Sequence, residues 1–219
     1  RDRYHPAIIK AKDIIKKKII GDLLYIRARY GHGARLNYHN EWRMNRKLSG
    51  GGELIDQGAH LIDLSRMFLG EFDKVDASLR KFYWKAKGQV DDNAFLTLTN
   101  KKNKVAFLHC SCTEWKNKFS FEIFGSKGKI DINGLGKSYG TEKLNLYIMK
   151  KKLGKPKMRS WKYYGKDNSW KLEIKKFFEN IYKNKNSESG LENAITNLKL
   201  ISLAYKKKVL SYDYNTQPT

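Results

Sequence analysis

Residues 50–63 read Gly-Gly-Gly-Glu-Leu-Ile-Asp-Gln-Gly-Ala-His-Leu-Ile-Asp, a glycine run followed by an apolar-periodic segment that predicts a helix. Asp56 and His60 are four residues apart, and this spacing places both side chains on one face of the predicted helix. A carboxylate beside an imidazole can orient a hydroxyl group and accept its proton. The stretch therefore predicts an acid–base site at the mouth of a glycine-rich loop.

The sequence on either side of this stretch predicts an α+β fold. Apolar residues at helical spacing indicate helices over residues 5–19, 53–69, 169–184 and 190–207. Alternation of apolar and polar residues indicates strands over residues 23–31, 74–84, 93–99, 104–114, 118–124, 129–132, 142–149 and 158–164. Because residues 100–103 and 125–128 have the composition of hairpin turns, their flanking strands should be antiparallel. We expect a large, mostly antiparallel sheet with helices packed on one face.

A long polar connection over residues 31–49 precedes the glycine run, and connections of this length inside a compact domain are often functional. Trp42 and Arg43 in this connection are candidate ligand-binding residues, because an aromatic face can cover a ring and a guanidinium can bind hydroxyl, carboxylate or phosphate groups. The glycines at 50–52 have several interpretations. They let a backbone approach a ligand, provide unusual backbone angles, or cradle a phosphate at the start of the helix.

Composition and charge narrow the class of protein. The chain has 219 residues, 40% of them hydrophobic, and a formal net charge of +23. Lysine supplies most of the positive charge and is dispersed along the chain, whereas a nucleic-acid surface favours clustered arginines with interleaved aromatic residues. No apolar run is long enough to cross a membrane. The sequence therefore favours neither a nucleic-acid nor a membrane partner.

The two cysteines, Cys110 and Cys112, fall in one predicted strand and point to the same face of the sheet. Two ligands do not make a metal site, so we expect no metal and interpret both as buried free thiols of a cytoplasmic protein. On the face of the sheet away from the helices we expect Phe82, Trp84 and Phe107 or their strand neighbours. An aromatic face without helices favours oligomerisation.

The order of several motifs resembles a known family. The motifs are Arg3-Tyr4-His5-Pro6-Ala7, the strand at 23–30, the signature at 50–63, the turn at 124–128 and the closing helix at 190–208. Together they resemble the C-terminal domain of the glucose–fructose oxidoreductase / inositol dehydrogenase / MocA (Gfo/Idh/MocA) family of NAD(P)-dependent oxidoreductases. The resemblance covers essentially all of residues 1–219 and implies a single C-terminal substrate-binding and oligomerisation domain. No Gly-x-Gly-x-x-Gly turn occurs in the sequence, and the N-terminal dinucleotide-binding domain that the family implies is absent from this chain.

The resemblance also implies roles for individual residues. His60 would take the proton of a substrate hydroxyl while hydride leaves the same carbon for the nicotinamide. Asp56 would bind a substrate hydroxyl and support His60 as it becomes cationic. The remaining roles are a substrate-binding set and one cofactor contact: Tyr30, His39, Trp42 and Arg43 would line the pocket with Asp56, and Arg3 would reach the cofactor.

The function expected from the sequence is the substrate-binding and catalytic half of an oxidoreductase that uses NAD or NADP, bound mainly by the missing domain. Its substrate would be a sugar or a nucleotide sugar. We expect a cytoplasmic homo-oligomer that assembles through the open sheet face. The alternative is a non-catalytic interaction or oligomerisation module.

Overall fold

The computed structural model describes residues 1–85, 90–185, 190–207 and 209–211. Within these ranges the strands are β1 (Leu23–Gly31), β2 (Lys74–Lys81), β3 (Asn93–Thr99), β4 (Val105–Ser111), β5 (Lys118–Gly125), β6 (Gly128–Asn133), β7 (Glu142–Ile148), β8 (Lys157–Tyr163) and β9 (Leu210–Ser211). All but the short β9 were predicted from the sequence. The longer helices are α1 (Pro6–Lys16), α3 (Ala59–Leu69), α4 (Ser169–Tyr182) and α5 (Leu191–Tyr205). Position 208, included in the predicted closing helix, lies outside the described residues.

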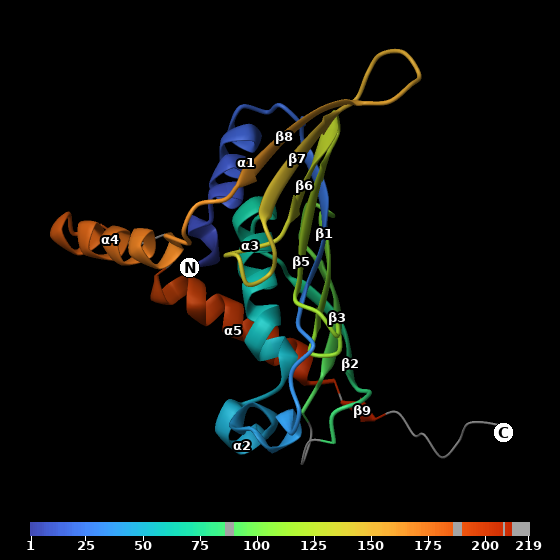
Figure 1. Ribbon diagram of the computed structural model, residues 1–219, viewed down its shortest axis with the longest axis vertical. Helices are drawn as coiled ribbons and strands as arrows, with labels where there is room; N and C mark the ends of the chain where they lie inside the picture. Colours follow the sequence, from blue (N-terminus) through green and yellow to red (C-terminus); the bar gives the residue numbers. More distant parts are fainter. Residues whose placement is uncertain (86–89, 186–189, 208, 212–219) are drawn as a thin grey trace.

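The described strands form one sheet in the order β8-β7-β6-β5-β1-β4-β3-β2-β9. Most neighbours are antiparallel, as the hairpins at β3–β4 and β5–β6 require, while β1 pairs with β4 and β2 pairs with β9 in parallel. Helices α1, α3 and α5 lie on one side of the sheet and leave the other side open (Figure 1). The predicted α+β architecture is confirmed.

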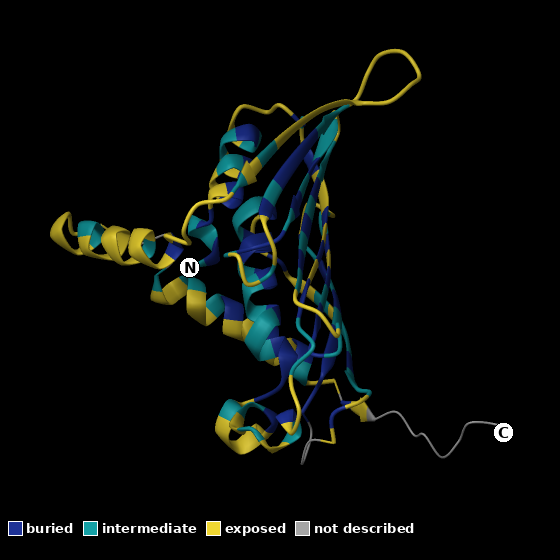
Figure 2. Ribbon diagram, viewed as in Figure 1, coloured by how far each residue is buried: buried dark blue, intermediate teal, exposed yellow. Residues whose placement is uncertain are grey.

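Strand β1 shows how the pattern sets the two faces. Its alternate residues Ile26, Ala28 and Tyr30 are buried in the main core, which lies between the sheet and the helices. The residues between them, Arg27 and Arg29, are exposed. Figure 2 shows the resulting division, with buried residues between the sheet and α3 and exposed residues along α4.

The open face was predicted to carry Phe82, Trp84 and Phe107 or their strand neighbours; of these, Phe107 is exposed, whereas Trp84 is buried and its neighbour Tyr83 is exposed. Phe107 is 49% exposed on β4. Trp84 is 8% exposed, and its indole N–H donates to the carbonyl of Cys112 at 2.9 Å within a second small core. The strand predicted over 74–84 ends at Lys81 because the Asp92 carboxylate accepts the amides of the next three residues and turns the chain inward.

The segment before α3 carries the candidate site. Three short turns follow β1: η2 (Tyr38–Asn40), η3 (Trp42–Met44) and α2 (Arg46–Ser49). A π-helical turn, η4 (Leu54–Gly58), then leads directly into α3. The helix predicted over 53–69 is thus present, with a widened first part. Such π turns occur frequently at functional sites.

Candidate active site

The glycine run is shaped by contacts with the protein itself. Gly50 ends α2 with φ of 81°, a left-handed conformation that suits glycine. A side chain at Gly51 would overlap the ring of Tyr205, and one at Gly52 would overlap the backbone of Asp91. Close packing and backbone angle therefore explain all three glycines.

Asp91 anchors the beginning of the helix. It is fully buried, and its carboxylate accepts hydrogen bonds from the amide of Gly52 at 3.1 Å, the amide of Leu54 at 2.7 Å and the hydroxyl of Tyr205 at 2.8 Å. Burial raises the pKa of Asp91, although these donors act in the opposite direction. The amides that a phosphate would use already have an acceptor, so this structure does not support a phosphate cradle here.

Gly52→Ala is expected to destabilise the protein by about 1–3 kcal/mol, because the new methyl group would meet backbone atoms of Asp91 that have little room to move. The midpoint of urea unfolding measures the effect. Gly165→Ala is the matched control, since a methyl group at Gly165 meets nothing within 4 Å. Equal stability of the two variants would contradict the close approach at Gly52.

His60 lies at the start of α3 with its ring 44% exposed. Its Nδ1 is 3.2 Å from Oδ2 of Asp2, a residue of the turn η1 (Asp2–Tyr4) that is 3% exposed. The ring also contacts Tyr30, with 5.8 Å between the ring centroids. The carboxylate beside His60 is therefore Asp2, which sequence reasoning missed, rather than Asp56.

Asp56 instead faces the loop that precedes the glycine run. Its Oδ2 lies 3.4 Å from Nε of Arg43, whose guanidinium stacks on the ring of Trp42 at 4.7 Å from the centroid. A cavity of ≈ 180 Å³ opens beside this group; its lining is Trp42, Arg43, Met44, Ser49, Gly51, Gly52, Glu53, Ile55 and Asp56. Three of the predicted substrate-binding residues are thus brought together in one cavity wall, and His60 lies outside that described lining.

The other two predicted substrate-binding residues, Tyr30 and His39, lie in different parts of the site region. Tyr30 is buried beneath His60, between the rings of Phe119 and Tyr139, and burial raises the pKa of its hydroxyl. His39 lies in the turn η2 and is half-buried. Tyr30 can therefore shape the floor under His60.

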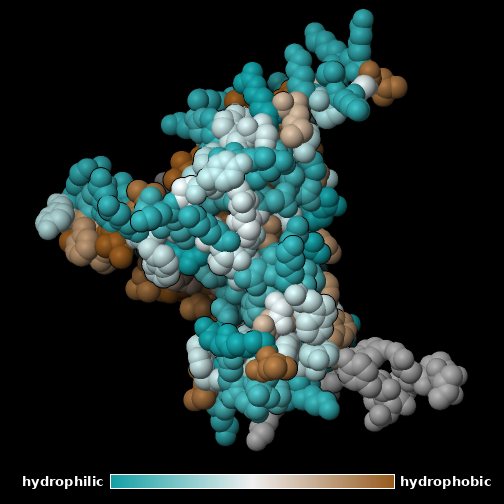
Figure 3. Space-filling view, in the orientation of Figure 1, coloured by the Kyte–Doolittle hydropathy of each residue, from teal (hydrophilic) through white to brown (hydrophobic). Residues whose placement is uncertain are grey.

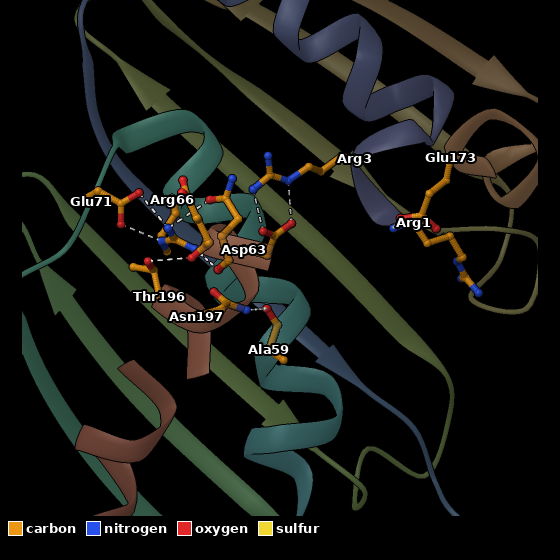
Figure 4. A network of polar contacts seen from close by, with 11 residues as sticks. Arg1, Arg3, Ala59, Asp63, Arg66, Glu71, Glu173, Thr196 and Asn197 are labelled. Carbon is orange, nitrogen blue, oxygen red and sulfur yellow. Dashed lines mark hydrogen bonds and ion pairs between the residues drawn. The ribbon is translucent and has the colours of Figure 1, made fainter. Parts of the chain in front are cut away.

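Arg3 has a structural partner. Its guanidinium donates two hydrogen bonds to the carboxylate of Asp63, at 2.8 Å and 2.6 Å, and so ties η1 to α3 (Figure 4). The same view shows α5 held to this helix, where the Asn197 amide donates to the carbonyl of Ala59 at 2.8 Å. The predicted cofactor contact of Arg3 stays a prediction.

Glu53, which lines the cavity, belongs to a second acid–imidazole pair. Nε2 of His32 is 3.4 Å from Oε1 of Glu53, and the Tyr38 hydroxyl donates to the same oxygen at 3.5 Å. Burial raises the pKa of Glu53, which is 2% exposed, although His32 opposes that shift. Burial alone would lower the pKa of His32, but Glu53 outweighs it and the pKa is raised. A first-turn glutamate is ordinarily solvated, so the sequence carried no signal for this burial.

The described parts of the chain contain no group of three or more His, Cys, Asp or Glu side chains arranged to hold a metal ion. They also contain no helix with the length and apolar character needed to span a membrane.

Similarity to known proteins identifies the family to which the chain belongs. The model of the GFO/IDH/MocA C-terminal domain matches residues 8–131, and the chain belongs to this family. Levoglucosan dehydrogenase of Pseudarthrobacter phenanthrenivorans is 37% identical in an alignment that covers 60% of this chain and 40% of that protein.

Solved structures agree on the fold. Levoglucosan dehydrogenase in complex with NADH and levoglucosan has a TM-score of 0.78 at 22% identity, covering 94% of this chain and 63% of that one. Aldose-aldose oxidoreductase from Caulobacter crescentus, complexed with glycerol, has a TM-score of 0.79 at 20% identity, covering 94% of this chain and 59% of that one. The chain thus spans less than two thirds of the length of these relatives.

Proposed function

We propose that this chain is the substrate-binding and catalytic half of an NAD(P)-dependent oxidoreductase acting on a hydroxyl-bearing carbon of a sugar or nucleotide sugar. The observation that carries the proposal is a half-exposed His60 that contacts a buried carboxylate, close to the Arg43–Asp56 cavity wall, in a chain of this family. In the forward direction His60 accepts the hydroxyl proton and the carbon gives up hydride, so the alcohol becomes a carbonyl group. NAD or NADP, when bound, supplies the hydride acceptor.

The cavity wall suits a polyhydroxylated ligand. Asp56 offers acceptors for hydroxyl groups, Arg43 offers donors, and the half-exposed ring of Trp42 offers an apolar face for a sugar ring. Relatives support the choice, since a levoglucosan dehydrogenase was solved with NADH and levoglucosan and another complex holds L-sorbose. We assign His39 to the rim of the same site as part of this proposal.

We propose that residues 1–219 form a single C-terminal domain. The dinucleotide would be held mainly by another domain of the complete protein. The helix-start amides here are already bound by Asp91, so they do not suit the dinucleotide phosphates. Helix α4 projects from the body and leaves more than half of several apolar side chains exposed: Trp170, Ile174, Phe177, Phe178 and Ile181. Figure 3 shows hydrophobic residues gathered along the lower side of this projection. A face of this kind is typical of a protein contact and supports docking of the second domain.

Calorimetry with NADH and NADPH tests the proposal. We expect the product of the complete gene to bind one of the two cofactors and the 219-residue chain alone to give little heat. Substrate screening with sugars and nucleotide sugars would follow on the complete protein. If the complete protein bound neither cofactor, the oxidoreductase proposal would fail and a non-catalytic interaction module would replace it.

We further propose that two copies of the chain associate through the open sheet face, in the cytoplasm. This face carries a hollow of ≈ 250 Å³ lined by the exposed Phe107 with Arg27, Arg29, His109, Ser120 and Glu122. Opposite charges such as Arg27 and Glu122, whose side chains are 2.7 Å apart, lie beside apolar rings, so the face is complementary to a second copy of itself.

Phe107→Glu is expected to convert this dimer to a monomer, because it buries an unpaired charge at the proposed interface. Sedimentation velocity measures the result. Leu36→Glu, at an exposed position in the loop between β1 and η2, is the control and should leave the dimer intact. A wild-type chain that sediments as a monomer at high concentration, alone and as the complete protein, would rule out this interface.

A further inference from the structure

His60 is the outer member of a series of imidazoles and carboxylates that leads into the protein. Its Nδ1 is 3.2 Å from Asp2, the other oxygen of Asp2 is 4.0 Å from Nε2 of His5, and Nδ1 of His5 is 3.2 Å from Glu142. Asp2, His5 and Glu142 are all buried. Glu142 also accepts the amide of Ala7 at 2.7 Å, so the inner end of the series is fixed to α1.

We propose that Asp2 is a positioning residue for His60: it holds the imidazole with Nδ1–H toward its own carboxylate and leaves Nε2 unprotonated to receive the substrate proton. This inference rests on the proposed function of His60 as the general base. It assigns the supporting carboxylate to Asp2 in place of Asp56, and Asp2 itself contacts no substrate.

Among the basic side chains within 4.0 Å of the Asp2 carboxylate, His60 is the nearest. Among the described residues neither carboxylate oxygen receives a hydrogen bond of good geometry, so the buried charge depends on neighbouring cations. Arg1 Nε is 3.5 Å away and His5 Nε2 is 4.0 Å away, both farther than His60. His5 is also engaged at its other nitrogen by Glu142. A buried carboxylate that lacks other hydrogen-bond donors favours a proton on Nδ1 of His60, because that N–H points toward its negative charge.

A separate ion pair fixes the distance between the two residues. Arg3, one position after Asp2, binds Asp63 through two hydrogen bonds, and Asp63 is one helical turn after His60 on α3 (Figure 4). The turn η1 is thereby attached to the helix that carries the imidazole. The Arg3–Asp63 pair thus holds the carboxylate of Asp2 against His60, which gives Arg3 a role that needs no cofactor.

The other groups around His60 act more weakly on its proton. Burial by itself would lower the pKa of His60, but the contact with Asp2 and the charges of Asp2 and Asp56 outweigh burial, so the pKa is raised. Asp56 is paired with Arg43, and Tyr30 contributes a ring contact. Burial would raise the pKa of Asp2, yet His60, His5 and Arg1 lower it.

The directions of these two pKa shifts define the pH range in which the pair stabilises the fold. The contribution of His60 to the free energy of unfolding is complete below its ordinary pKa of 6.5 and is lost as pH rises through its higher pKa in the folded protein. The contribution of Asp2 is complete above its ordinary pKa of 3.8 and is lost as pH falls through its lower folded value. The pair therefore stabilises the protein most between about pH 4 and pH 6.5.

Nitrogen-15 NMR of the histidine side chains tests the proposal on the 219-residue chain without any substrate. In the wild type we expect neutral His60 to carry its proton on Nδ1. In Asp2→Asn we expect the pKa of His60 to fall by about one unit or more and the proton to move toward Nε2. Asp13→Asn, which removes an exposed carboxylate paired with Lys17 on α1, is the control and should leave His60 unchanged.

An unchanged pKa and tautomer of His60 in Asp2→Asn would overturn the proposal. If that variant does not fold, the wild type still decides, because neutral His60 with its proton on Nε2 contradicts the assignment. The readout is independent of cofactor binding. A failed cofactor experiment with a normal NMR result would therefore reject the oxidoreductase function alone.

Discussion

Replacing His60 with alanine is expected to lower turnover by about 10²–10⁴-fold in a complete enzyme that contains this chain and its dinucleotide-binding domain. His60 is the half-exposed imidazole beside the cavity, and alanine leaves no group to accept the hydroxyl proton. Cofactor affinity should change little, because the proposed dinucleotide contacts lie in the other domain. Initial rates at saturating cofactor, with calorimetry of NADH or NADPH, separate the two effects.

His109→Gln is the matched control for this experiment. His109 lies on β4, stacks on Phe95 with ring centroids 4.3 Å apart and has Nε2 2.9 Å from the side-chain oxygen of Asn93. Burial lowers its pKa to about 4, so it stays neutral at physiological pH and has no expected part in proton transfer. A His60→Ala enzyme that keeps the turnover of the wild type would remove His60 from the mechanism.

Asp91→Ala is expected to destabilise the protein by about 3 kcal/mol or more, because it strands several buried donors at once. The amides of Gly52 and Leu54 and the hydroxyl of Tyr205 all donate to this carboxylate, which is fully buried. Urea unfolding followed by tryptophan fluorescence measures the loss.

Asp73→Ala is the control for Asp91, since Asp73 is an exposed carboxylate between α3 and β2. Its stability should remain within about 0.5 kcal/mol of the wild type. Asp91→Asn keeps an acceptor oxygen and should fall between the two. A fully stable Asp91→Ala protein would mean that the glycine run and helix start are held by other contacts.

The sequence by itself determined the fold class because its periodic patterns are local. Apolar and polar residues alternate over 26–30 and over 96–99, and the structure has the strands β1 and β3 at these positions. The turn at 125–128 sets β5 and β6 antiparallel, and the π turn with α3 follows the predicted start of the helix. The family was likewise recognisable from the spacing of motifs along the chain, and the match to residues 8–131 confirms it.

Only the tertiary structure decided which side chains meet at the site. Helical spacing suggested Asp56 as the partner of His60, but Asp56 lies 3.4 Å from Arg43 and the contact to His60 comes from Asp2, 58 positions earlier in the chain. The same limit applies to Trp84, which turns inward because Asp92 binds its amide. Contacts between residues distant in sequence depend on how the elements pack, and no local pattern of apolar and polar residues encodes them.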